Sequence, residues 1–169
     1  MQWHFKPPTD TLQCWLSQTN LPHWLFHECV ETSQLPNKGK KGKNYQLEAF
    51  FIEDTKEMRE RCNNARRLER NVHPLQQDDF CCTQNDFFQF LIGNTDYSVA
   101  YQHNEKLLFV EGMKAIPVPY DFDMCGLVNA SYAVVSQVAG ETLPITDVTQ
   151  RFWRGFERPP GVYEQVRDH

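Results

Sequence analysis

The alternation of apolar and polar side chains predicts a β-strand at residues 45–54. Leu47, Ala49 and Phe51 fall on one face at a spacing of two residues, and the opposite face also carries apolar side chains. A strand that is apolar on both faces is typical of the interior of a sheet that is covered on both sides. We therefore expect this strand to be central.

A charged helix is predicted after this strand. Asp54 or Thr55 is a suitable N-cap for a helix that starts at Lys56. The helix is rich in basic residues, and glutamates are available to pair with them: Arg59, Arg61, Arg66, Arg67, Arg70, Glu57, Glu60 and Glu69. We expect the helix to break at residues 71–74, because the residue before a proline disfavours the helical conformation.

Residues 76–92 predict a second helix. Phe80, Phe87 and Leu91 recur at near-helical spacing, with further apolar side chains beside them. An aromatic stripe of this kind is more typical of a hydrophobic core than of a ligand site. We expect the helix to hold the polar loop that follows it on a rigid base.

A polar loop, a β-hairpin and an acidic tip follow. Residues 107–110 predict a short apolar strand, and Gly112 lies where a hairpin turn favours glycine. The hairpin would bring the loop that contains Asp96 and Asn104 beside the tip at residues 121–123. Carboxylate and amide oxygens would then share one site, and such hard ligands suit Mg²⁺ or Mn²⁺ with phosphates completing the coordination shell.

The carboxy-terminal part of the chain has a less regular pattern. Residues 132–138 are apolar and predict either a strand or a buried loop. Residues 144–147 are typical of a helix start, and Gly155 is a suitable end for that helix. A short last helix is predicted at residues 162–169.

The composition is that of one folded domain, with 169 residues of which 40% are hydrophobic. The formal net charge of −5 argues against a nucleic-acid-binding protein, which usually carries a basic excess. No stretch approaches the roughly 20 apolar residues of a membrane helix, and residues 1–8 lack the apolar core of a signal peptide. We expect neither a nucleic-acid partner nor a membrane segment, and the localisation stays open.

The order of the polar residues around the hairpin resembles the catalytic half of atypical kinases. Asp96 is followed by Asn104, by a strand and by an Asp-Phe-Asp block at residues 121–123. This order is most similar to that of the CotH-like spore-coat kinases and more distantly to HipA-type and phosphoinositide kinases. Residues 87–133 also resemble a group of uncharacterised bacterial proteins that share the Pro-Tyr-Asp-Phe-Asp block.

The resemblance implies a role for each of these polar residues. In such kinases a loop Asp orients the phosphate acceptor, and a following Asn and a further Asp bind metal ions. Asp96 then corresponds to the catalytic Asp, Asn104 and Asp121 to metal ligands, and Asp123 to an additional metal ligand. One departure is that Asn104 follows Asp96 by eight residues, whereas about five separate the two in typical kinase loops.

The resemblance also implies a hinge strand and a cofactor. In kinases the hinge holds adenine through backbone hydrogen bonds, so ATP with Mg²⁺ or Mn²⁺ is the implied cofactor. The residues that resemble the hinge of CotH-like proteins are Phe51, Ile52, Glu53 and Asp54.

The implied fold class is α+β. Residues 45–169 would form a mostly helical, kinase-like C-terminal lobe with a hinge strand and a short β-hairpin that carries the metal-binding loop. Residues 1–44 would form an irregular segment, either a remnant of a small amino-terminal lobe or a truncated one, because they are short for that lobe and carry no glycine-rich cover. We therefore expect the small lobe to be largely missing.

The expected function is metal-dependent phosphoryl transfer from ATP to a protein or small-molecule acceptor that the sequence does not identify. The missing small lobe leaves two further possibilities open, a fragment of a kinase-like domain and a domain without activity. Two alternatives are a non-catalytic interaction module on a kinase-like scaffold and a metal-dependent hydrolase that uses the same carboxylates. Asp side chains locked in structural hydrogen bonds would indicate the interaction module. A bound divalent ion without nucleotide affinity would indicate the hydrolase.

Overall fold

The computed structural model describes residues 55–62, 64–140 and 142–168. The amino-terminal segment at residues 1–44 and the predicted central strand at residues 45–54 lie outside this range. The predicted hinge residues also lie outside it: Phe51, Ile52, Glu53 and Asp54. Within the described residues, no helix is long and apolar enough to cross a membrane.

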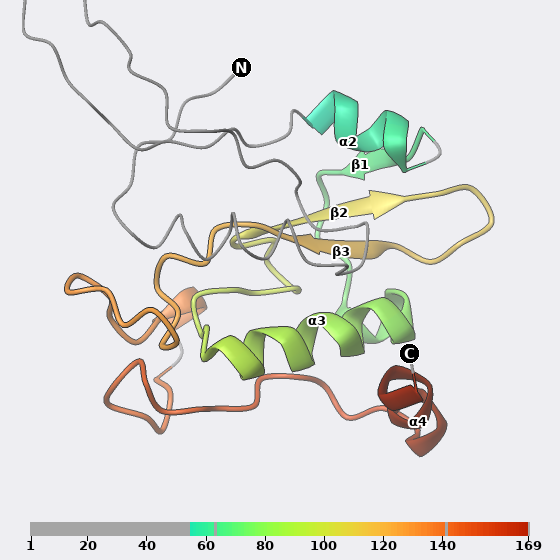
Figure 1. Ribbon diagram of the computed structural model, residues 1–169. Coiled ribbons are helices and arrows are strands. Elements are labelled where there is room, and N and C mark those ends of the chain that lie inside the picture. The colour runs from blue at the N-terminus through green and yellow to red at the C-terminus, as the bar shows by residue number, and fades with distance from the viewer. Residues whose placement is uncertain (1–54, 63, 141, 169) are drawn as a thin grey trace, which may run out of the picture.

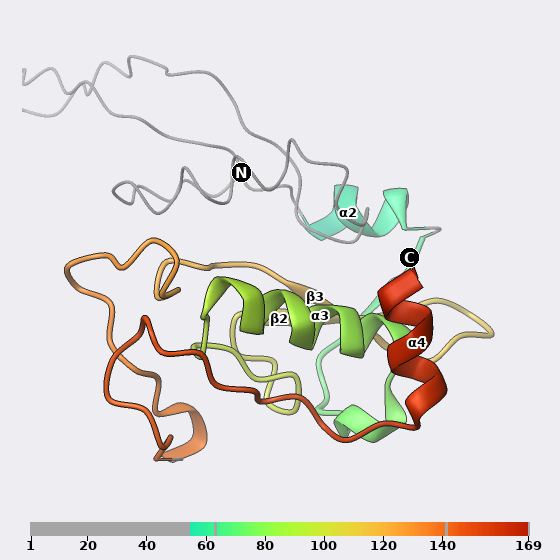
Figure 2. The same ribbon diagram turned by 60° about the horizontal axis from the view of Figure 1, so that its bottom comes forward.

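The described residues form an α+β fold, as predicted. The elements in chain order are α2 (Thr55–Arg61), β1 (Arg66–Leu68), the 3₁₀ turn η1 (Pro74–Gln76), α3 (Asp79–Ile92), β2 (Glu105–Phe109), β3 (Ile116–Pro119), the 3₁₀ turn η2 (Val138–Gly140) and α4 (Pro160–Asp168). The strands form one antiparallel sheet in the order β1-β2-β3. Helices α2 and α3 lie on opposite sides of this sheet, and α4 packs against α3 near its start (Figures 1 and 2).

A hydrophobic core joins α2, the sheet and the end of α3. Met58 of α2, Leu108 of β2 and Val118 of β3 are each at most 2% exposed. Ile92 at the end of α3 and Phe122 after β3 belong to the same cluster. Full burial of such a side chain contributes about 1.5–3 kcal/mol. The core therefore anchors the two places where the chain enters and leaves the candidate site, after α3 and after β3.

Helix α3 confirms the predicted second helix, and its ends follow from its capping residues. Asp78 is the N-cap, because its Oδ1 accepts a hydrogen bond of 2.9 Å from the backbone N–H of Cys81. The helix therefore begins three residues later than predicted. Gly93 ends the helix in the left-handed conformation with a φ of 65°.

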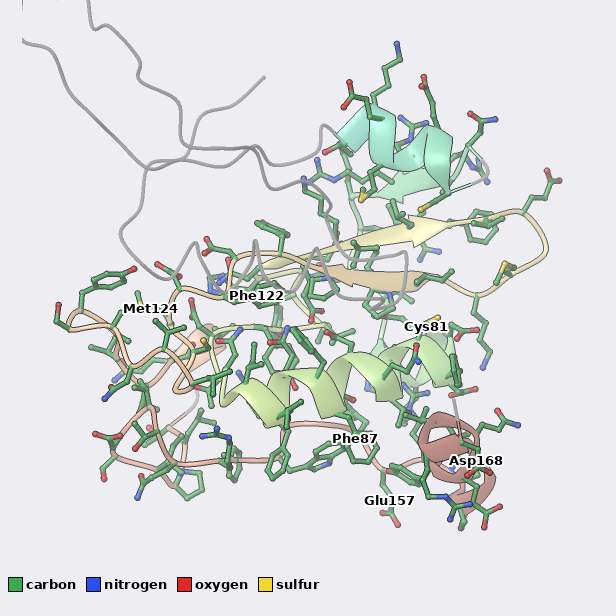
Figure 3. All side chains as sticks on the ribbon, in the orientation of Figure 1. Cys81, Phe87, Phe122, Met124, Glu157 and Asp168 are labelled. Carbon is green, nitrogen blue, oxygen red and sulfur yellow. The ribbon has the colours of Figure 1, made fainter. Side chains whose placement is uncertain are left out.

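Only part of the apolar stripe of α3 contributes to the core: Ile92 belongs to it and Phe88 packs against it, whereas the rest of the stripe does not, which corrects the expectation for those residues. Phe87 is 44% exposed and Leu91 is 69% exposed. The carboxy-terminal part of the chain crosses this face beside Phe87 (Figure 3). The rings of Phe87 and Trp153 lie 4.9 Å apart between centroids. The face of α3 that the sheet buries is mostly polar instead, which the apolar pattern did not indicate.

The charged helix predicted from Lys56 is wrong beyond Arg61. Asn64 has a φ of 55°, a left-handed conformation through which a right-handed helix does not continue. Arg66–Leu68 then form β1, in which Arg66 lies opposite Phe109 of β2. Arginine has a high helix propensity, but the strand pairing outweighs it. Among the described strands β1 lies at an edge of the sheet, and charged side chains suit an edge because they disfavour pairing with another chain.

The predicted β-hairpin is confirmed. In β2 and β3, Glu105 lies opposite Pro119 and Leu108 lies opposite Ile116. Gly112 occupies the connecting turn with a φ of 80°. As a result, the start of β2 and the end of β3 lie at the end of the sheet where α3 also ends (Figure 1).

The helix predicted from residues 144–147 is absent from the described residues. Asp147 Oδ1 accepts a hydrogen bond of 2.8 Å from the backbone N–H of Thr149, and this local turn competes with a helix. The chain then runs in an irregular path along α3 as far as α4, which confirms the short last helix (Figure 1). Of the segment 132–138, residues 132–137 form an irregular loop, in which Val134 is 64% exposed, and η2 begins at Val138.

We expect Gly126→Ala to destabilise the protein. The N–H of Gly126 donates to Gly93 O at 2.9 Å, and a Cβ on Gly126 would lie 1.9 Å from the carbonyl oxygen of Val148. The backbone must move to admit it, at a cost of about 1–3 kcal/mol or more. Gly161→Ala is the matched control, because a Cβ there meets no atom within 4 Å and Ala favours helix. Denaturant unfolding measures both variants, and equal stability of Gly126→Ala and the parent would contradict the close approach.

Candidate functional site

The carboxylate of Asp96 accepts hydrogen bonds on both oxygens. Oδ1 accepts from Ser136 Oγ at 2.9 Å, and His103 Nε2 lies 3.1 Å from the same oxygen. Oδ2 accepts from Asn104 Nδ2 at 2.9 Å. Asn104 Nδ2 also donates to the main-chain oxygen of Asp96 at 2.8 Å. The predicted catalytic residue and the first predicted metal ligand are therefore in direct contact, in spite of the longer spacing between them.

The orientation of the Asn104 amide follows from these contacts. Both of its partners on Asp96 are acceptors, so Asn104 must present its nitrogen to them and not its oxygen. Among the described residues, Asn104 Oδ1 accepts no hydrogen bond. This leaves an amide oxygen available to a ligand beside the carboxylate.

The main chain around Asp96 is fixed from two directions. The N–H of Asp96 donates to Asn94 Oδ1 at 3.0 Å. Arg154 NH1 donates to the carbonyl oxygens of Thr95 at 2.5 Å and Tyr97 at 2.8 Å, the residues on either side of Asp96. Sequence reasoning did not identify Arg154, because it lies far along the chain in a segment without a regular pattern.

A relay of buried amides continues from Asn94 to the start of β2. Asn94 Nδ2 donates to Gln89 Oε1 at 2.9 Å, and Gln89 Nε2 donates to Asn85 Oδ1 at 3.4 Å. Asn85 Nδ2 donates to Glu105 Oε1 at 2.5 Å. Because the N–H of Asp96 is a donor, each amide must turn its oxygen toward Asp96 and its nitrogen toward Glu105. We call Asn85, Gln89, Asn94 and Glu105 the amide relay.

The relay ends on a carboxyl group that burial keeps protonated. Glu105 is 1% exposed, and burial raises its pKa to about 8, although the hydrogen bond from Asn85 acts in the opposite direction. The neighbouring Asp86 raises the pKa further. Glu105 Oε2 has no hydrogen-bond partner among the described residues. At neutral pH the carboxyl group is therefore mostly protonated, and its Oε1 accepts from Asn85.

The predicted metal ligand Asp121 follows directly on the β2–β3 pairing. The N–H of Tyr120 donates to the carbonyl oxygen of Asn104 at 2.9 Å, which extends the pairing beyond the last residue of β3. Phe122 packs edge-on against Phe88 of α3, with ring centroids 5.4 Å apart (Figure 3). Asp121 is half-buried, whereas Asp123 is only 8% exposed.

Left-handed backbone conformations gather at this place. Asn104 has a φ of 53°, Asp121 a φ of 62° and Gln102 a φ of 52°. Asn and Asp tolerate this conformation better than most residues, but each such residue still stores strain. Strained backbone is frequent at functional sites. The three residues therefore distinguish this end of the sheet from ordinary turns.

The donor set fits a divalent cation only in part. Among the described residues, no three His, Cys, Asp or Glu side chains gather as a metal-binding group, so Asp96, Asp121 and Asp123 do not together form one. The Oδ1 atom of Asn104 and a carboxylate at Asp121 are hard oxygen donors of the kind that Mg²⁺ and Mn²⁺ prefer. A site of this type requires phosphate oxygens and water to complete its coordination.

Comparisons with protein-family models, curated proteins and solved structures found no match to the chain. The assignment of a function therefore depends on the chemistry of the residues and on the resemblance in their order.

We expect Glu105→Gln to reduce the loss of stability at rising pH. The folded protein holds the Glu105 proton up to about pH 8, whereas the unfolded chain loses it near pH 4.5. The contribution of Glu105 to the free energy of unfolding is complete below about pH 4.5 and decreases as the pH rises toward about 8. The fall is up to about 1.4 kcal/mol per pH unit. Gln keeps the acceptor for Asn85 and has no titrating proton.

Denaturant unfolding at several pH values between about 5 and 8 measures this effect. The parent protein should lose more stability across this range than Glu105→Gln does. Glu111→Gln is the control, since Glu111 is exposed in the hairpin turn. If Glu105→Gln and the parent have the same pH dependence, Glu105 is not protonated in the folded state.

Proposed function

We propose that the chain is a kinase-like phosphotransferase that transfers a phosphoryl group from a nucleotide to an acceptor hydroxyl. The observation that carries the proposal is the contact between Asp96 and Asn104. Asn104 donates twice to Asp96 through Nδ2, which turns its oxygen away from Asp96. Asn104 Oδ1 and the Asp121 carboxylate would bind Mg²⁺ or Mn²⁺ on the nucleotide phosphates. Such a cation would neutralise charge on the phosphoryl group.

Asp96 is suited to orienting the acceptor. A carboxylate offers about four lone-pair positions. Ser136 and His103 occupy Oδ1, with His103 as a donor in the tautomer that carries its proton on Nε2. Asn104 occupies one position on Oδ2, so one position on Oδ2 remains for a hydroxyl of the acceptor. The fixed main chain on both sides of Asp96 would hold this position in place.

We assign the carboxylate ligand to Asp121 in preference to Asp123. Asp121 is the residue with the left-handed φ of 62°, and it follows the residue that pairs with Asn104. Asp123 is only 8% exposed, which makes it less accessible to a nucleotide. Its role would be to support the tip and not to contact the cation directly.

A non-catalytic interaction module is the second candidate, and one observation favours it. Ser136, His103 and Asn104 hold the Asp96 carboxylate in structural hydrogen bonds. Such bonds stabilise a loop whether or not it binds a nucleotide. A measurement of nucleotide binding separates the two candidates.

We expect Mn²⁺ and ATP together to raise the melting temperature, and neither alone to do so to the same extent. A ligand that binds only the folded state stabilises it by mass action. Asp121→Gly should abolish the joint effect and still fold, because glycine adopts a φ of 62° without strain. Asn64→Gly is the matched control, since it replaces another left-handed residue, with a φ of 55°, in the turn between α2 and β1.

The two candidates give different results in this experiment. A joint shift that persists in Asn64→Gly and is lost in Asp121→Gly supports the phosphotransferase. A folded parent protein without a joint shift, or a shift that Asp121→Gly retains, rejects the nucleotide site and leaves the interaction module.

A further inference from the structure

A cavity of about 250 Å³ lies between the first half of α3, the loop after Asp96 and the carboxy-terminal segment. Among the described residues, four aromatic rings and two charged side chains, Asp86 and Arg154, line it. The aromatic residues are Tyr97, Tyr101, Phe152 and Phe156. Asn104 and Asp121 do not line it, so the cavity is separate from the proposed nucleotide site.

Asp86 is a buried carboxyl group with few partners. It is 5% exposed, and its hydrogen bond is a long one of 3.3 Å from the hydroxyl group of Tyr97. Among the described residues, Asp86 forms no ion pair. Burial raises the pKa of Asp86 to about 7, and the hydrogen bond from Tyr97 and the more distant arginines only partly oppose this. The fold thus maintains a desolvated acid at the wall of a cavity.

The two nearby arginines are engaged elsewhere. Arg154 NH1 donates to the carbonyl oxygens of Thr95 and Tyr97, and its guanidinium carbon lies 5.5 Å from the centre of the Tyr97 ring. Arg158 pairs with Asp79 and donates to the carbonyl oxygen of Pro74. Neither forms the close ion pair that would fully compensate an ionised Asp86.

Gly155 allows the main chain of the carboxy-terminal segment to approach Asp86 closely. Gly155 lies between the lining residues Arg154 and Phe156. A Cβ on Gly155 would be 2.8 Å from Asp86 Oδ2 and 2.4 Å from the Trp153 ring. Any larger residue at this position would therefore contact the carboxyl group.

We propose that this cavity binds a small organic cation, whose ammonium group pairs with Asp86 and whose apolar body lies against the aromatic rings. An ammonium ion is attracted both by a carboxylate and by the faces of aromatic rings. The volume lies just below the usual range for ligand pockets, which restricts the ligand to a small molecule. The proposal does not depend on the phosphotransferase assignment.

Binding of such a cation depends on pH, because it requires the ionised form of Asp86. The groups that face Asp86 are Cys82 of the same helix, Glu105 of β2, Tyr97 of the loop, and Arg154 and Arg158 of the carboxy-terminal segment. Burial raises the pKa values of Cys82 and Tyr97, so both stay neutral at pH 7. Burial raises the pKa of Glu105 to about 8, so this neighbouring group ionises above pH 7. Affinity should therefore rise up to about tenfold per pH unit below pH 7, where only Asp86 changes charge, and change less steeply above it.

The experiment compares three probes of similar shape: benzylamine, benzyl alcohol and benzoate. Each is titrated at millimolar concentration into the full chain at about pH 8, where Asp86 is mostly ionised. Melting temperature and the chemical shifts of the loop after Asp96 report binding. We expect benzylamine, which is cationic at this pH, to bind at least about tenfold more tightly than the other two.

Asp86→Asn tests the residue itself. The variant keeps the shape of the side chain and removes a charge that is costly to bury, so it should fold. It should weaken benzylamine binding by at least about tenfold and abolish the rise in affinity below pH 7. Glu157→Gln is the control for general attraction of cations, since Glu157 is exposed beside the cavity segment and points away from the molecule (Figure 3).

Three outcomes would overturn the proposal. The first is benzyl alcohol or benzoate binding as well as benzylamine, and the second is benzylamine binding unchanged in folded Asp86→Asn. The third is the absence of any response of the folded parent protein to benzylamine at millimolar concentration. Tight binding that is lost in Asp86→Asn and kept in Glu157→Gln supports it.

Discussion

Water is excluded from the face of α3 that meets β2, so the polar groups there must bond to one another. Burial of an amide without a partner costs about 1–3 kcal/mol. The amide relay meets this constraint with a single direction of donors, from Asp96 to Glu105. Reversal of one amide would place donor against donor at one end and acceptor against acceptor at the other. The relay therefore has one satisfied arrangement, and this arrangement fixes the main chain at Asp96.

The amide relay also connects the two ends of the loop that contains the candidate site. Asn94 lies at the start of the loop after α3, and Glu105 is the first residue of β2. The side chains thus connect the two ends of a loop that the main chain already joins. A loop held at both ends and clamped by Arg154 pays little conformational entropy when a ligand binds. Such pre-organisation is what a catalytic or a recognition site requires, and it explains why Asp96 and Asn104 meet although their spacing exceeds the kinase pattern.

The local elements could be predicted from the sequence, because their signals are local. The period of α3, the apolar strand of β2 and the glycine turn each depend on a few neighbouring residues. The end of α2 at Arg61 could not be predicted from the sequence, because it depends on the pairing of β1 with β2, a contact between distant segments. The aromatic stripe was misleading for a similar reason. Whether the sheet covers the apolar or the polar face of α3 depends on partners such as Glu105 and Trp153, which lie elsewhere in the chain.

The candidate site shows the same division. The order of Asp96, Asn104 and Asp121 along the chain can be seen in the sequence. The contacts of Ser136 and Arg154 with the segment around Asp96 depend on the tertiary fold and cannot be predicted from the sequence. One sequence signal was present and unused: Asn85 and Gln89 are polar residues four apart, which places them on one face of a helix. A polar helix face opposite an apolar stripe normally faces solvent. This signal alone would therefore predict that the face with Asn85 and Gln89 is exposed, whereas it is the buried face of α3.

Tyr97 connects the two sites in one residue. Its hydroxyl group donates to Asp86 in the cavity, and its carbonyl oxygen, adjacent to Asp96, accepts from Arg154. The hydrogen bond from the Tyr97 hydroxyl group and the positive charge of Arg154 both lower the pKa of Asp86 and so favour its ionised form. The same guanidinium holds the main chain on both sides of Asp96. A charge that appears or is neutralised at Asp86 therefore acts on the groups that position Asp96.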